Sequence, residues 1–314
     1  AARLLPAVEA GLEAATATCG GDEDQADALR CGAAALLGAA ASHLPPGDPR
    51  VGTVLATLLD VLRTPSASVQ AMAADALPGL MPALGGPGPQ KALLDKLIAA
   101  AIAPGASYGD RKGAAYGLAG AVKGLGLSAV NGMGVLDAVK GAIGDATDPG
   151  AREGGLLLFE ALVDRLGRLF EPYVVQCMPA LLDRFGDSAA PVRTACEGAA
   201  RAVMAALSSQ GVKLTLPTLV AGAAPATGTH WRSQAGSVTM LGAMAHCAPR
   251  QLATALPSVV PALSAALADP HPRVAEAAKA ALAEVGGVVR NPEVRGLAPA
   301  LLAAIADPGA AARP

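Results

Sequence analysis

The chain has 314 residues, of which 52% are hydrophobic and only 2% aromatic, so its interior must be built from leucine, valine and alanine. Its formal net charge of −2 argues against a general nucleic-acid-binding domain, which is usually basic over the whole domain or over one large face. The five cysteines form an odd set without a Cys-x-x-Cys spacing, which is typical of reduced thiols rather than of a disulfide framework or a zinc site.

A repeat of about forty-one residues runs through the chain. Its marker is the residue predicted to open the second helix of each unit, and successive markers are 40, 42, 40, 41, 39, 43 and 38 residues apart. The markers are Leu29, Val69, Arg111, Ala151, Val192, Trp231, Val274 and Ala312. A period of this length, made of two amphipathic helices, is typical of a HEAT or armadillo solenoid. We therefore predict an all-α solenoid of about seven helix pairs plus a partial eighth, in which residues 1–314 form a single continuous array.

The units follow from their apolar stripes and from the turns between them. The second helix of the seventh unit shows the stripe most clearly, with apolar residues at intervals of three and four: Val274, Ala277, Ala278, Ala281, Leu282 and Val285. An acidic loop at 22–24 is expected inside the first unit, and proline and glycine at 45–47 end it. The units are predicted at about 4–43, 50–84, 90–127, 131–169, 171–207, 211–248, 250–289 and, as a partial unit, 292–314. Since neither end carries a polar capping repeat, we expect a fragment of a longer solenoid.

Acidic and basic residues six positions apart recur at the turn between the two helices of a unit. They are Asp24 and Arg30, Asp187 and Arg193, and Asp307 and Arg313. Partly buried charges in stacked repeats usually satisfy one another, so we interpret these pairs as a structural ladder between repeats. An anion-binding row on the concave face is the alternative interpretation.

The sequence contains no motif that predicts catalysis or a cofactor. The glycine-rich stretches at 86–91 and 132–134 do not match a nucleotide-binding loop, and no nucleophile elbow or four-ligand metal spacing is present. Glu160 and Asp164 share a helix face, which we interpret as solvent-exposed rather than as an acid–base pair. Trp231 is interpreted as packing against an adjacent unit, with a partner anchor as the alternative. We predict that the protein is not an enzyme and needs no cofactor or metal; a catalyst holding its substrate in the concave groove is the remaining alternative.

Five stretches of the chain resemble one protein family. They read DRKGAAYGLAGAVKGLG at 110–126, LGRLFEPYVVQCMPALLDRFGD at 166–187, GVKLTLPTLVAG at 211–222, WRSQAGSVTMLGAMAHCAPRQL at 231–252 and RNPEV at 290–294. These stretches are similar to the very large HEAT-repeat translational activators of general amino-acid control, in which this segment is similar to the HEAT region of elongation factor three. The resemblance runs from about residue 91 to the C-terminus, whereas the first ninety residues match only the generic repeat pattern.

The resemblance implies a scaffold segment of a ribosome-associated translational activator in the cytoplasm. The full protein of this family promotes phosphorylation of initiation factor two alpha under amino-acid starvation or ribosome stalling. Its implied partners are the ribosome and, through the full-length protein, an ATP-binding-cassette protein and the initiation factor two alpha kinase. No membrane partner and no direct DNA binding are expected. A HEAT adaptor for transport or phosphatase-type complexes, without ribosome binding, is the alternative function.

Basic residues of the second helices are the candidates for contact with the ribosome or a partner. Arg111, Lys112 and Lys123 are the first candidates, and Arg152, Arg193 and Arg232 form a second row. Because contacts to phosphate release counterions, such a patch predicts an association that weakens as salt rises.

Overall fold

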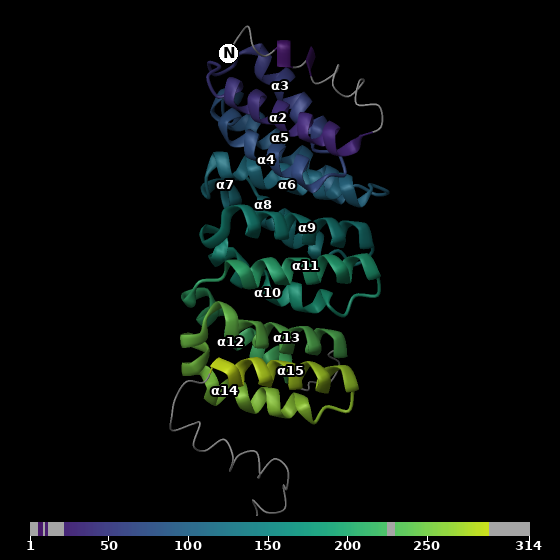
Figure 1. Cartoon of the computed structure of the whole chain (residues 1–314), viewed down its shortest axis with the longest axis vertical. Coiled ribbons are helices and arrows are strands. Elements are labelled where there is room, and N and C mark those ends of the chain that lie inside the picture. The colour runs from purple at the N-terminus through teal and green to yellow at the C-terminus, as the bar shows by residue number, and fades with distance from the viewer. Residues whose placement is uncertain (1–5, 9, 12–21, 225–229, 289–314) are drawn as a thin grey trace, which may run out of the picture. The chain divides into compact units, whose positions relative to one another are not determined.

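The computed structural model describes residues 6–8, 10–11, 22–224 and 230–288, and within these ranges the regular elements are all helices (Figure 1). The predicted all-α class is thereby confirmed. The predicted partial unit at 292–314, with Asp307 and Arg313, lies outside the described residues. Contacts along the chain divide it into two compact units, residues 1–207 and 208–314, so each is described by itself and the continuity of the array between them stays a prediction.

In the first compact unit, the second helices of successive repeats pack against one another in order. These helices are α2 (Glu23–Ala41), α4 (Ala67–Leu80), α6 (Tyr108–Leu125), α9 (Pro149–Leu166) and α11 (Ala190–Ala206). Figure 1 shows α9 and α11 lying side by side, as this packing requires. Each second helix from α4 onward also packs against the first helix of its own repeat: α3 (Pro49–Val61), α5 (Pro87–Ile102), α8 (Val135–Ile143) and α10 (Glu171–Arg184). Between residues 22 and 207 the unit also contains three short helices: η1 (Pro82–Leu84), α7 (Ser128–Gly132) and η2 (Gly167–Phe170).

The described part of the second compact unit, residues 208–224 and 230–288, contains two helix pairs. The first helices are α12 (Ser209–Ala223) and α14 (Pro249–Leu267), and the second helices are α13 (Trp231–Cys247) and α15 (Pro272–Val288). Each second helix packs against its own first helix, and α13 also packs against α15. The two-layer repeat predicted from the apolar stripes is therefore present in both units.

Several second helices begin at a residue whose side chain caps the helix. Ser107 caps α6 by accepting a hydrogen bond from the backbone N–H of Asp110 at 3.1 Å. Asp22 caps α2 in the same way, so the acidic residues expected in a loop are instead the cap and first turn of a helix. Negative charge is favourable at this end of a helix because it faces the positive end of the helix dipole.

Small residues let neighbouring helices approach at backbone distance. A Cβ added at Gly120 of α6 would overlap the carbonyl group of Ala74 in α4. A Cβ at Gly154 of α9 would likewise overlap the carbonyl group of Ala101 in α5. The scarcity of aromatic residues follows from this packing, because closely spaced helix axes leave little room for large rings.

Candidate functional site

A row of polar side chains at the fourth residue of the second helices joins each helix to the turn of its own repeat. Each donates a hydrogen bond to a backbone carbonyl at the end of the first helix or in the turn that follows. The pairs are Gln70 with Thr64 (2.9 Å), Arg111 with Ala101 (2.8 Å), Arg152 with Asp145 (3.2 Å), Arg193 with Asp187 (2.7 Å) and Gln234 with Ala223 (3.2 Å). At the same position α2 has Ala26 and α15 has Ala275.

Four of these side chains also reach the next repeat. Gln70 donates to the Gly109 carbonyl at 2.9 Å, Arg111 to the Gly150 carbonyl at 2.8 Å, and Gln234 to the Asp269 carboxylate at 3.0 Å. Arg152 makes the strongest contact, two hydrogen bonds of 2.7 and 3.0 Å to the Asp187 carboxylate. The row therefore forms a ladder between repeats.

The pairing within this ladder differs from the sequence prediction. The sequence pattern pairs Asp187 with Arg193, but the Asp187 carboxylate binds Arg152 of the preceding repeat, and Arg193 donates to backbone carbonyls of its own turn. Arg30 pairs with Asp27 at 2.9 Å rather than with Asp24. The predicted marker of the first unit, Leu29, lies six residues after the start of α2 at Glu23. Arg30 follows this marker, so it lies too far along the helix to occupy the ladder position, which is the fourth residue.

Two of the six cations expected to contact partners are buried. Arg111 is 4% exposed and Arg152 is 6% exposed, because both guanidinium groups bind the turns described above. Their interpretation as exposed contacts is not supported by the structure.

The other four cations are at least partly exposed but lie in different surroundings. Lys123 pairs with Asp75 of α4 at 3.8 Å, Arg232 lies over the Trp231 ring at 4.5 Å, and Arg193 binds its own turn. Lys112 is half-buried, with its ammonium 5.6 Å from the centre of the Tyr108 ring. These side chains do not form a single basic patch within the first compact unit.

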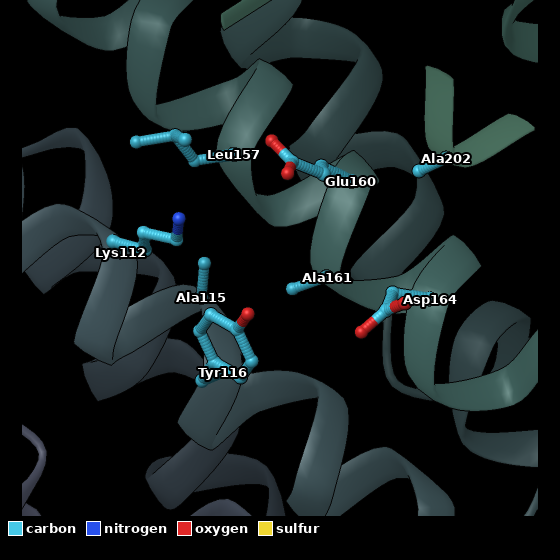
Figure 2. A pocket seen from close by; sticks show the side chains of 8 residues that line it. All are labelled: Lys112, Ala115, Tyr116, Leu157, Glu160, Ala161, Asp164 and Ala202. Carbon is cyan, nitrogen blue, oxygen red and sulfur yellow. The ribbon is translucent and has the colours of Figure 1, made fainter. Parts of the chain in front are cut away.

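Lys112 instead lines a small pocket between α6, α9 and α11 (Figure 2). The cavity has a volume of about 130 Å³ and is lined by Lys112, Ala115 and Tyr116 of α6, by Leu157, Glu160, Ala161 and Asp164 of α9, and by Ala202 of α11. Figure 2 shows the Glu160 carboxylate and the Lys112 ammonium pointing into the space from facing helices.

The charged groups of the pocket influence one another. Burial raises the pKa of Glu160 above its ordinary value, Asp164 raises it further, and the charges of Lys112 and Arg201 act in the opposite direction. Burial disfavours the charged form of Lys112, but Tyr108, Tyr116 and Glu160 raise the pKa of the lysine overall. The expectation that Glu160 and Asp164 share a solvated face is correct for Asp164, whose side chain is 60% exposed, and wrong for Glu160, which is partly buried.

One wall of the pocket is held by an ion-pair network that spans three second helices. Arg165 of α9 donates to the Asp75 carboxylate of α4 at 2.9 Å, and its guanidinium lies 5.0 Å from the centre of the Tyr116 ring of α6. Asp75 and Arg165 are ninety residues apart, so no local sequence signal predicts this contact. The network fixes Tyr116 beside the pocket.

The described ranges contain no group of three or more His, Cys, Asp or Glu side chains arranged to hold a metal ion. In the same part of the chain, none of the helices combines the length and the apolar character that crossing a bilayer requires. Trp231 stacks on His271 of the next repeat with ring centroids 4.0 Å apart, which confirms its interpretation as a packing residue.

Comparison with known proteins identifies relatives along almost the whole chain. The chain is 44% identical to the human protein named stalled ribosome sensor GCN1 over 97% of its own length, and 36% identical to the Saccharomyces cerevisiae eIF-2-alpha kinase activator GCN1 over the same share. It covers only 11% of either relative. Elongation factor 3 of Gonapodya prolifera is 27% identical over 71% of the chain and 20% of that protein.

Solved structures show the same fold at low sequence identity. The karyopherin Kap121p bound to Pho4p matches 98% of this chain and 32% of its own with a TM-score of 0.53 and 15% identity, which shows the fold alone. The predicted resemblance to the translational activators is confirmed, and it extends further toward the N-terminus than residue 91. The family model described as EF3 N-terminal HEAT repeat matches residues 111–282, and the chain therefore belongs to this HEAT-repeat family.

Proposed function

We propose that the chain is a non-catalytic scaffold segment of a ribosome-associated translational activator. In this proposal the full-length protein acts in the cytoplasm and promotes phosphorylation of initiation factor two alpha under amino-acid starvation or ribosome stalling. The observation that carries the proposal is the 44% identity, over 97% of the chain, to a protein named stalled ribosome sensor. The full-length protein would bind the ribosome, an ATP-binding-cassette protein and the initiation factor two alpha kinase.

The structure supports a scaffold through its rigid repeats. Ladder contacts such as the pair between Arg152 and Asp187 join neighbouring repeats within each compact unit, so side chains on the second helices that they join keep defined positions. For contact with the ribosome or a partner we retain Lys112, Lys123, Arg193 and Arg232, whose side chains are at least partly exposed. Charge reversal at Lys123 and Arg232 should weaken ribosome co-sedimentation most at low salt, because phosphate contacts are screened as salt rises.

A segment exchange tests the proposal. The matching segment of human GCN1 is replaced by this chain, and the chimera is expressed in human cells that lack GCN1. We expect the chimera to co-sediment with ribosomes and to restore phosphorylation of initiation factor two alpha when ribosomes stall. A second chimera with the equivalent Kap121p segment, which shares the fold at 15% identity, is the matched control and should not restore it.

Two results would contradict the proposal. Either both chimeras are expressed at the normal level and both restore phosphorylation, or this chain fails as completely as the Kap121p segment. The transport-adaptor alternative has no observation in its favour, because the likeness to Kap121p at 15% identity concerns the fold only.

A further inference from the structure

The carboxylate of Glu160 is partly desolvated and has no close partner. Within the described part of the chain it makes no hydrogen bond, and no cation lies within ion-pair distance of it. Lys112 and Arg201 influence it only through their charges from further away. A carboxylate withdrawn from water costs free energy unless donors replace the water, so this group is open to an external donor.

The pocket in front of Glu160 is small, with a volume of about 130 Å³. Sites for cofactors and drug-sized ligands are larger, about 300–1,000 Å³. A partner would therefore insert a single side chain while its backbone stays outside.

Charge and shape select the class of that side chain. Asp164 lies four residues after Glu160 on the same face of α9, so one wall carries two carboxylates against the single ammonium of Lys112. The aromatic ring of Tyr116 forms the neighbouring wall. A planar guanidinium offers five donors to such carboxylates, is more weakly hydrated than an ammonium, and packs well beside aromatic rings.

The wall from α11 leaves room for this arrangement. A Cβ at Gly198 would lie 2.9 Å from a carboxylate oxygen of Glu160, so the missing side chain allows the carboxylate to sit between α9 and α11. Ala202 lines the pocket one helical turn later and is partly exposed. We propose that the pocket between α6, α9 and α11 binds one arginine side chain of a partner polypeptide lying on this face.

Fluorine NMR on the 314-residue chain tests this proposal and does not depend on the ribosome. The chain has three tyrosines, so labelling with 3-fluorotyrosine gives one signal in the pocket, Tyr116, one from Tyr108, whose ring lies beside Lys112, and one internal reference, Tyr173, which does not line the pocket. N-acetyl-arginine methylamide is titrated at constant ionic strength and pH 7.5, with the citrulline analogue as the uncharged isostere. We expect a saturable shift of the Tyr116 signal, and binding of the arginine probe about tenfold tighter than that of the citrulline probe.

Matched variants locate the interaction. Glu160→Gln removes the charge at constant shape and should weaken arginine binding about tenfold. Glu197→Gln makes the same change at an exposed position of α11 outside the pocket, so the affinity for the arginine probe should stay within about twofold of the wild-type value. Ala202→Leu should block binding without removing a charge, and circular dichroism verifies the folding of each variant. Equal binding of both probes, tighter binding of N-acetyl-glutamate methylamide, or the absence of a saturable Tyr116 shift would each overturn the proposal.

Discussion

Replacing Arg152 with leucine removes the donor of a buried ion pair between repeats. The Arg152 and Asp187 side chains are 7% and 3% exposed, and the guanidinium donates to both carboxylate oxygens. After the substitution, Asp187 keeps the backbone N–H of Ala189 at 2.9 Å and a weaker contact with Arg184 at 3.4 Å. Most of the charge compensation of a buried carboxylate is therefore lost.

The cost of this change is a large share of the stability. Removing one partner of a buried ion pair typically destabilises a protein by about 3–5 kcal/mol, and domains are stable by about 5–15 kcal/mol in total. Because Arg184 remains, we expect about 3 kcal/mol for Arg152→Leu. Adding Asp187→Asn should recover part of this loss, since the double variant no longer buries an uncompensated charge.

The same pair predicts a dependence on pH. Burial raises the pKa of Asp187, but hydrogen bonds from Arg152 and Ala189 and the nearby positive charges lower it overall below its ordinary value. A lowered pKa in the folded state contributes stability that is present above the unfolded pKa, about 3.9, and is lost as the pH falls through the folded value. The difference between wild type and Arg152→Leu should therefore be largest at neutral pH and should shrink as the pH falls, because protonation removes the uncompensated charge that the variant buries.

Urea denaturation followed by circular dichroism measures these effects. The control is Arg273→Leu, which removes an arginine from an exposed pair whose side chains are 70% and 72% exposed, and it should change the stability by no more than about 0.5 kcal/mol. If Arg152→Leu shifts the urea midpoint no more than this control, or if the double variant is less stable than the single one, the ladder does not hold the repeats together as argued.

Three further changes test the packing. Gly154→Ala should destabilise the chain by about 2–3 kcal/mol in urea denaturation because its Cβ meets a neighbouring carbonyl group, whereas Gly141→Ala, with nothing within 4 Å, should stabilise it by about 0.5–1 kcal/mol. Similar effects at both glycines would contradict the close approach. His271→Ala should shift the emission of Trp231, the single tryptophan, to longer wavelength because the stacked ring is lost; an unchanged spectrum would refute the stack. Burial raises the pKa of Cys196, so a maleimide at pH 7.5 should leave this thiol unmodified until urea is added, as mass spectrometry can establish, and rapid labelling in the native chain would contradict its burial.

The repeat period predicts the fold because each helix pair carries its own apolar stripe. The register of the ladder is not determined by that stripe. The predicted markers of the third and sixth units are Arg111 and Trp231, whereas the structure places Arg111 and Gln234 at the ladder position of these units. The capping residue provides the missing signal, since counting four residues from the cap of α13, His230, gives Gln234. Counting from the cap succeeds because the cap fixes where the helix begins, and the turn before it varies in length.

The pocket could not be predicted in this way, because it depends on side chains from three repeats. Arg111 and Lys112 are neighbours in the sequence, but one residue turns a helix by about 100°, so the first side chain enters the ladder and the second faces the pocket. The position of the Glu160 carboxylate depends further on Gly198 of the next repeat, because a side chain at Gly198 would come too close to it. Charge type alone therefore does not separate cations that hold the repeats together from those that can meet a partner. At the fourth residue of their helices Arg111 and Arg152 are buried in the ladder and serve the fold, so we expect contact with a partner from cations that stay at least partly exposed, such as Lys112 and Arg193.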